Sequence, residues 1–257
     1  MKLEEICQAA IAKQLYGVAV TDHANLNQFD EDVLVQCFSE RTPAYQLCRD
    51  QYCDRLKFLC GIEIGEYLRE SEKAKRLLSL QEYDQIIAAI HYLQFNGNDI
   101  TFAAAVFDHH VTDEEIYQYL SIYFEDLLKT AETFDFDVLA HLTYPLRYIN
   151  IKYERKIEIG YFEEIICHIF KTIIERNFSL EVNTSHFQDR FQYQLTPDVN
   201  LLKRYRSMGG NLVTLGSDAH IPHKIGLGFD AVRKILKDLG FEHCCYYEKR
   251  IPTKIVL

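Results

Sequence analysis

Short apolar runs alternate with longer amphipathic stretches along nearly the whole chain, and this rhythm limits the folds open to it. The apolar runs are rich in β-branched residues and cover 17–23, 57–65, 85–93, 137–145, 178–185 and 211–220. The amphipathic stretches, whose apolar residues recur every three or four positions, cover 3–15, 44–56, 113–134, 157–177, 198–208 and 229–239. Strands that alternate with helices are typical of a parallel sheet, so the sequence predicts an α/β fold.

Local signals mark two of the helix starts. Thr112 followed by Glu115 resembles a capping box, which predicts a helix from residue 113. Thr196-Pro197 predicts the start of the next helix, because proline is favoured in a first helical turn. No Gly/Ser-rich linker, low-complexity tract or internal repeat interrupts the chain, so we expect a single domain over 1–257.

Composition excludes several classes of protein. With 28 basic and 38 acidic residues, the formal charge of −10 disfavours binding to nucleic acid or anionic lipid. No apolar run approaches the roughly 18–20 residues of a membrane span, and the N-terminal segment lacks a secretory signal pattern. The 8 cysteines form no CxxC pair, so we expect reduced thiols. These features together predict a cytoplasmic protein.

Polar or ionisable residues end each apolar run, and their placement distinguishes between α/β architectures. A (β/α) barrel collects such residues from several strand ends at its C-terminal rim, whereas a doubly wound sheet binds ligands mainly at one switch point. No GxGxxG or P-loop pattern follows any strand. The barrel is therefore the expected architecture. The residues at the strand ends are His23, Glu63, His91, His141, Asn183, Asp218 and His220.

These residue types favour a metal site. A lone histidine at a strand end is more often structural, but that explanation is hard to apply to six strand ends at once. Imidazoles and carboxylates without thiolates suit Zn, Mn or Fe, and the donor set exceeds the four ligands of one tetrahedral ion. We therefore expect two to three divalent ions with a bridging carboxylate. Neighbouring ions of this kind suit the hydrolysis of phosphate esters.

Six short motifs follow one another along the chain: TDH (21–23), GIEIGE (61–66), AIHYL (89–93), LAHLTYP (139–145), LEVNTS (180–185) and GSDAH (216–220). Taken in order, they resemble the motifs of the PHP (polymerase and histidinol phosphatase) family. The histidinol-phosphatase branch is the most similar, because GLGFD (226–230) follows the last motif. This resemblance implies a distorted (β/α)7 TIM-like barrel with a trinuclear metal centre.

The resemblance also implies roles for individual residues. Glu63 would bridge two ions, and His91 and His141 would complete the second ion's ligands. Asp218 would bind the first ion, while His23 and His220 would bind the third. Glu63, His141 and Asp218 are thus the residues that we expect to matter most for catalysis.

Four further residues are expected around this centre. Asp22 would orient a metal ligand. Arg147 is the candidate for binding the substrate phosphate, because its planar guanidinium suits phosphate oxygens. His186 and His223 are candidates for substrate contact.

The sequence departs from the family pattern at one point. The family begins with an HxH motif on its first strand, and no HxH occurs in these 257 residues. We therefore expect the first strand and two ligands of the first ion to be missing, together with one ligand of the third. Either Met1 is a misassigned start or the protein is truncated.

The predicted function is that of a metal-dependent phosphomonoesterase, a histidinol phosphatase of histidine biosynthesis. Its expected partner is a small phosphate ester, and a homo-oligomer is left open. One alternative is a PHP phosphoesterase that acts on another phosphomonoester or a nucleotide. The other is a pseudoenzyme with an impaired metal site, which the missing HxH motif suggests.

Overall fold

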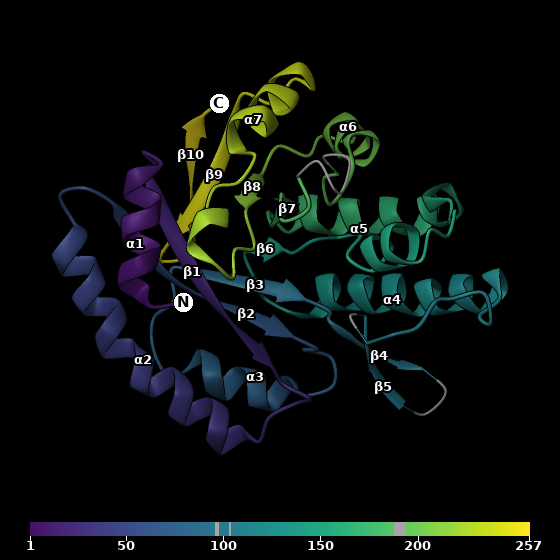
Figure 1. The fold of residues 1–257 in the computed structure, drawn as a ribbon, viewed down its shortest axis with the longest axis horizontal. Helices are drawn as coiled ribbons and strands as arrows, with labels where there is room; N and C mark the ends of the chain where they lie inside the picture. The colour runs from purple at the N-terminus through teal and green to yellow at the C-terminus, as the bar shows by residue number, and fades with distance from the viewer. Residues whose placement is uncertain (96–97, 103, 188–193) are drawn as a thin grey trace.

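A curled sheet of six parallel strands forms the centre of the computed structural model, which describes residues 1–95, 98–102, 104–187 and 194–257 (Figure 1). The strand order is β1-β2-β3-β6-β7-β8, so β1 and β8 form the two edges. This confirms the α/β, TIM-like fold, with six parallel strands described where the family resemblance implies seven. The strands are β1 (Gly17–Asn25), β2 (Lys57–Gly65), β3 (Gln85–Ala89), β6 (Val138–Leu139), β7 (Ser179–Asn183) and β8 (Val213–Gly216).

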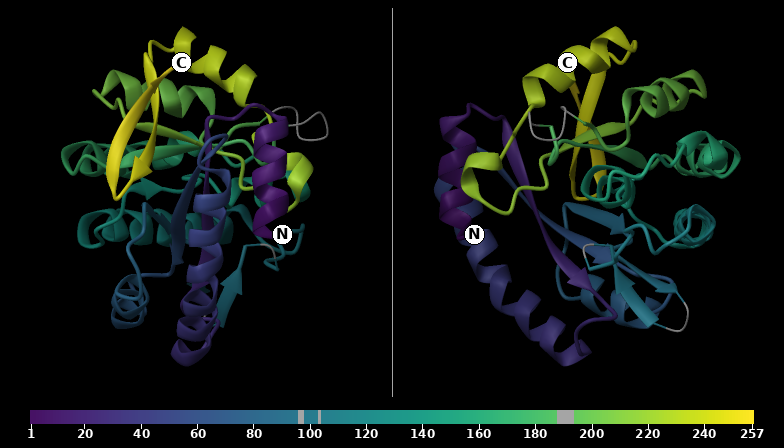
Figure 2. Two further views of the ribbon diagram at one scale, coloured as in Figure 1. Left: turned by 90° about the vertical axis from the view of Figure 1, so that its left-hand side faces the viewer. Right: turned by 45° about the vertical axis from the view of Figure 1, so that its right-hand side comes forward.

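Helices surround the strands, as Figures 1 and 2 show. They are α1 (Leu3–Ala12), α2 (Glu31–Tyr52), α3 (Ser71–Leu78), α4 (Asp113–Thr133), α5 (Glu163–Glu175), α6 (Val199–Ser207) and α7 (Phe229–Asp238). Short helical segments cover Arg147–Lys152, Ile159–Phe162 and Pro222–Lys224. The capping box that begins α4 is present as predicted, with Thr112 and Glu115 bonded reciprocally. None of the helices in the described ranges is long and apolar enough to cross a membrane.

Three helix starts differ from expectation. Helix α5 begins at Glu163 instead of residue 157, after the short helical segment Ile159–Phe162. Helix α2 begins at Glu31 instead of residue 44, and Pro43 lies inside it. The buried residues of α2 are few, so the apolar periodicity that marks a helix in the sequence did not extend to its first half. Helix α6 begins at Val199, and the Asp198 side chain, rather than Thr196-Pro197, caps it by accepting from the main chain of Leu201.

Four strands, β3, β6, β7 and β8, are shorter than their apolar runs, and two of them end next to the predicted site. Strand β3 ends at Ala89, and the chain then forms an antiparallel hairpin of β4 (Tyr92–Phe95) and β5 (Asn98–Thr101). Strand β6 covers only Val138–Leu139 of the apolar run 137–145. In both places the chain leaves the sheet just before a histidine of the predicted site.

A C-terminal hairpin packs against the end of the sheet at which the parallel strands begin, opposite the end that carries the predicted site residues. Its strands are β9 (His243–Glu248) and β10 (Ile251–Val256), drawn in yellow in Figure 2. The Tyr247 hydroxyl lies 2.8 Å from the Ser179 hydroxyl at the start of β7. Tyr247 also belongs to a small buried cluster with Ile87 and Val138. Below the site, the inner face of the sheet is therefore filled by the hairpin, and the larger apolar core lies between the sheet and the helices.

Candidate functional site

Glu63 is the centre of the candidate site. One of its carboxylate oxygens, Oε1, lies 3.1 Å from His91 Nε2, 3.3 Å from His141 Nε2 and 3.6 Å from His23 Nδ1. The parallel register places His23 directly opposite Glu63, and the other two histidines follow β3 and β6. Four of the predicted residues are thus brought together around one oxygen atom.

Burial and contacts shift the pKa values of this cluster in different directions. Burial alone would raise the pKa of Glu63, but His23, His141 and His91 outweigh burial and hold that pKa well below its usual range. Burial lowers the pKa of His141 despite its contact with Glu63. For His91, burial also acts to lower the pKa, but the neighbouring Glu63 carboxylate outweighs it and raises the pKa. The cluster therefore combines an anionic carboxylate with imidazole nitrogens that face it.

The donor set of this cluster fits a divalent cation. The Nε2 atoms of His91 and His141 lie 3.3 Å apart, similar to their distances from Glu63. Ligands bound at about 2.0–2.1 Å to a tetrahedral zinc ion lie about 3.3 Å from one another. A buried carboxylate also needs a compensating positive charge, which an ion in this position would supply.

Asp218 and His220 form a second group with His23. Their ligand atoms all lie within 4.8 Å of one another. The rings of His23 and His220 stack with centroids 5.6 Å apart, and His220 Nδ1 lies 3.6 Å from Asp218 Oδ1. His23 belongs to both groups, so the six predicted ligands form one continuous cluster across the strand ends.

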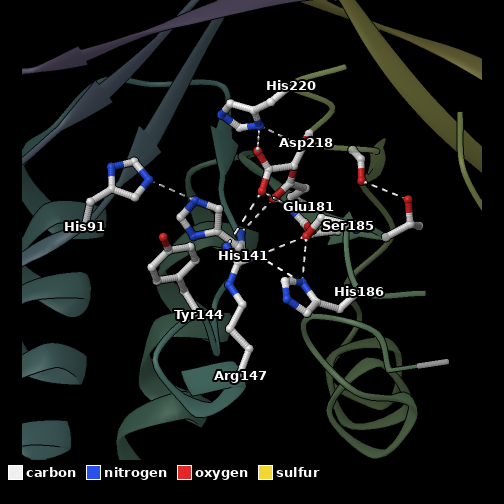
Figure 3. A network of polar contacts seen from close by, with 12 residues as sticks. His91, His141, Tyr144, Arg147, Glu181, Ser185, His186, Asp218 and His220 are labelled. Carbon is white, nitrogen blue, oxygen red and sulfur yellow. Dashed lines mark hydrogen bonds and ion pairs between the residues drawn. The ribbon is translucent and has the colours of Figure 1, made fainter. Parts of the chain in front are cut away.

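Arg147 lies beside this cluster, and its guanidinium is held on several sides (Figure 3). It stacks on the Tyr144 ring at 3.8 Å from the centroid. Its Nη1 donates to Ser185 Oγ at 3.0 Å and to His186 Nδ1 at 3.1 Å, and Nη2 lies 3.7 Å from Asp218. Among the residues that the structure describes, its buried Nε has no hydrogen-bond acceptor. The guanidinium is therefore fixed in place beside the candidate metal ligands.

A cavity of about 430 Å³ joins the cluster to Arg147. The side chains of Tyr92, Tyr144 and Tyr148 contribute aromatic surface, and Lys224 adds a second cationic side chain. Its remaining walls include His23, Asn25, His91, Thr101, Arg147, Ser185, His186, Asp218 and His220. The cavity therefore combines potential metal ligands, two cationic side chains and aromatic rings, which suits a small phosphate ester with a planar group.

Two predicted residues lie elsewhere. Asp22 faces α2, where its carboxylate contacts the Tyr45 hydroxyl and lies 2.7 Å from Arg41 Nε. Successive residues of a strand point to opposite faces, so Asp22 points away from the metal cluster that its neighbour His23 faces, and it contacts none of the predicted ligands directly. His223 is exposed and is not among the residues that line the cavity, although its main-chain carbonyl accepts from Lys13 Nζ at 2.7 Å.

A family model described as "PHP domain" matches residues 1–185, well over half of the chain. The chain belongs to the PHP domain family. The match confirms the resemblance that the six motifs indicated, and four of the metal ligand candidates, His23, Glu63, His91 and His141, lie inside the matched range.

Curated relatives of this PHP domain cover most of its length. A probable histidinol-phosphatase of Clostridium acetobutylicum is 28% identical over 253 residues, which are 98% of this chain and 92% of the relative. The histidinol-phosphatase of Lactococcus lactis is 25% identical over 236 residues, which are 90% of this chain and 83% of that protein.

Solved structures share the fold of this PHP domain. The crystal structure of histidinol phosphate phosphatase from Lactococcus lactis, complexed with zinc, L-histidinol and phosphate, gives a TM-score of 0.75 at 22% identity. That match covers 98% of this chain and 92% of that chain. The putative histidinol phosphatase of Listeria monocytogenes gives a TM-score of 0.71 at 14% identity, covering 89% and 93% of the two chains. At these identities the likeness establishes the barrel fold.

The structure adds three residues that the sequence analysis missed. Tyr144 lies within the LAHLTYP motif and supports Arg147. Glu66 and Glu181 also lie within motifs. Their carboxyl groups accept hydrogen bonds from the main-chain N–H groups of His91 and His141, and these bonds are visible only in the structure. Burial, followed by the Asp218 and Glu63 carboxylates, raises the pKa of Glu181 to about 8. Hydrogen bonds to main-chain groups far away in the sequence leave no local pattern, unlike the capping box at Thr112, so these contacts could not have been predicted.

Proposed function

We propose that this PHP domain is a metal-dependent phosphomonoesterase that hydrolyses L-histidinol phosphate to L-histidinol and phosphate, a step of histidine biosynthesis. The observation that carries the proposal is the Glu63 oxygen that three imidazoles face, directly beside the cavity that contains Arg147. The names of the full-length relatives support the choice of substrate.

The proposed centre holds two to three divalent ions, with Zn, Mn or Fe as candidates. One set of ligands is Glu63, His91 and His141, and the other is His23, Asp218 and His220. Such ions would lower the pKa of a water molecule and neutralise charge on the phosphate oxygens. The low pKa of Glu63 keeps its carboxylate anionic, so it can bind a cation across the working pH range.

Arg147 orients the phosphate group in this proposal. Its stacking on Tyr144 and its bonds to Ser185 and His186 fix the plane of the guanidinium before substrate binds. A fixed planar donor loses little conformational entropy when it binds phosphate oxygens. The guanidinium would therefore place the phosphorus atom between the two sets of metal ligands.

His186 is the candidate for contact with the substrate on the Arg147 side. Because Arg147 donates to Nδ1 of His186, that nitrogen accepts, and the neutral ring carries its proton on Nε2. The ring is then able to donate a hydrogen bond from Nε2 to a substrate oxygen.

The test is phosphate release from L-histidinol phosphate by the purified chain with added Mn²⁺ or Zn²⁺. We expect turnover in the wild type and none in Glu63→Ala, with both proteins showing the same circular dichroism spectrum. Faster turnover of another phosphomonoester or a nucleotide in the same assay would contradict the proposed substrate. Bound metal without release from any phosphomonoester would contradict the proposed reaction.

A further inference from the structure

Two buried glutamates form hydrogen bonds with the main chain of His91 and His141, the histidines whose rings face Glu63. We propose that Glu66 and Glu181 are positioning residues, which hold His91 and His141 by their main-chain N–H groups and thereby set the metal affinity of the Glu63 cluster. This inference rests on the proposed metal-dependent function.

Glu181 holds the end of β6. Its Oε2 accepts from the main-chain N–H of His141 at 2.8 Å and from the Asn183 amide at 3.2 Å. Strand β6 ends at Leu139, and His141 has a φ of 25°, which residues other than glycine rarely adopt. The N–H of His141 therefore bonds to the Glu181 side chain and not to a neighbouring strand. This bond helps to hold the unusual backbone conformation that directs the imidazole at Glu63.

Glu66 plays the same part for the end of β3. Its Oε1 accepts from the main-chain N–H of His91 at 2.6 Å and from that of Tyr92 at 3.0 Å. Glu66 is 4% exposed, and Glu181 is 6% exposed. Removing either side chain would leave a buried main-chain N–H without an acceptor, at His91 or at His141, whose rings face Glu63.

The close approach of Gly216 supports a specific position for the Glu181 carboxylate. A Cβ atom at residue 216 would lie 1.8 Å from Glu181 Oε1, so only glycine leaves room for the carboxylate where it lies. Three strand ends therefore meet at Glu181: His141 after β6, Asn183 at the end of β7 and Gly216 at the end of β8.

Zinc affinity of the purified metal-free protein tests the proposal without relying on turnover. The dissociation constant would be measured by competition with a chromogenic zinc chelator, and folding would be monitored by circular dichroism. We expect Glu181→Ala and Glu66→Ala each to weaken zinc binding by about 10- to 100-fold, as loss of groups that orient metal ligands does elsewhere. Glu181→Gln and Glu66→Gln keep an acceptor oxygen and should restore affinity to within a few-fold of the wild type.

Gly216→Ala acts on Glu181 without changing the carboxylate itself. We expect it to weaken zinc binding as Glu181→Ala does, and the double variant to bind no more weakly than either single variant, because the two changes remove the same contact. This variant and the glutamine variants keep the test conclusive if an alanine variant fails to fold.

The matched control is Asp137→Ala. Asp137 Oδ2 also accepts from a main-chain N–H, that of Ile86 at 2.7 Å, but at the opposite end of the sheet. We expect this variant to lose stability and to bind zinc as the wild type does. Wild-type zinc affinity in Glu66→Ala and Glu181→Ala would overturn the positioning role. Zinc binding that Glu63→Ala leaves unchanged would instead overturn the proposed metal centre.

Discussion

The Nε2 atoms of His91 and His141 lie 3.3 Å apart and face the same oxygen of Glu63. Three neighbouring strands, β2, β3 and β6, supply these groups, so the geometry depends on the register of the sheet. The arrangement brings donors into contact at about the spacing that a tetrahedral ion requires.

Replacing the shared carboxylate should abolish metal binding and turnover together. In Glu63→Gln the side chain keeps its shape but loses its charge, so we expect kcat/KM to fall by more than about 100-fold, beyond the loss typical of residues that only orient ligands. Added Zn²⁺ should raise the melting temperature of the wild type and not that of the variant. Glu132→Gln, on the exposed surface of α4, is the control. A metal-dependent rise in melting temperature that survives in Glu63→Gln would contradict the role assigned to Glu63.

Arg147 should contribute mainly to substrate binding. Hydrogen bonds to charged groups are worth about 1.5–3 kcal/mol, so Arg147→Met should raise KM by about 10- to 100-fold and weaken inhibition by inorganic phosphate to a similar degree. Arg147→Lys keeps the charge but loses the planar stack on Tyr144, so we expect an intermediate KM. An unchanged inhibition constant for phosphate in Arg147→Met would show that phosphate binds elsewhere.

The carboxyl of Asp137 should make stability depend on pH. Burial raises its pKa from 3.8 to about 6, even though Ile86 and Arg250 act in the opposite direction. The folded state therefore binds this proton more tightly than the unfolded state does. Its contribution to stability is complete below pH 3.8 and is lost as the pH rises through about 6.

Chemical denaturation of Asp137→Asn and of the wild type at several pH values measures this effect. The free energy of unfolding of the wild type minus that of the variant should decrease between about pH 4 and pH 6 and then level off. Asp54→Asn, at an exposed position in the turn after α2, serves as the comparison. A difference that grows over the same interval would show that the pKa of Asp137 is lowered by folding.

Arg250 should stabilise the fold without contributing to the reaction. Its Nε donates to Asp137 at 3.2 Å, and its Nη1 donates to Asp135 at 2.9 Å, which fastens the C-terminal hairpin to the starts of the strands. We expect Arg250→Met to lower the free energy of unfolding by about 2 kcal/mol and to leave kcat per folded molecule unchanged. Lys57→Met breaks a single pair with Glu248, whose side chain is 44% exposed where that of Asp137 is 5% exposed, and should cost less than about 1 kcal/mol. Equal losses in the two variants would contradict this assignment.

The sequence predicted the architecture and the ligand candidates because both leave periodic signals. Apolar runs marked the sheet, and β2 matches its run of 57–65 exactly. Polar strand ends marked His23, Glu63, His91 and His141, which the structure brings together. The sequence did not reveal where β3 and β6 end. Just beyond those ends, main-chain N–H groups bond to the buried side chains of Glu66 and Glu181, which are distant in the sequence. The start of helix α2 was misplaced because the helix buries few residues, so apolar periodicity marked only its second half.

The assignment of Asp22 illustrates the limit of reasoning from adjacency. It precedes His23, and alternation along β1 sends its side chain outward to Arg41 and Tyr45. Arg147 shows the opposite case. Its place shortly after His141 suggested contact with phosphate, and the structure places it on the cavity wall next to Asp218.

The strand order places the two sets of candidate ligands in regions that should open at different rates. Glu63, His91 and His141 belong to or follow interior strands, each paired on both sides, whereas His23 lies on edge strand β1 and Asp218 follows edge strand β8. Edge strands fray at lower free energy than interior ones, so amide hydrogens of β1 should exchange with deuterium sooner than those of β2. Local fluctuations would thus rearrange the outer half of the site while the inner half stays intact.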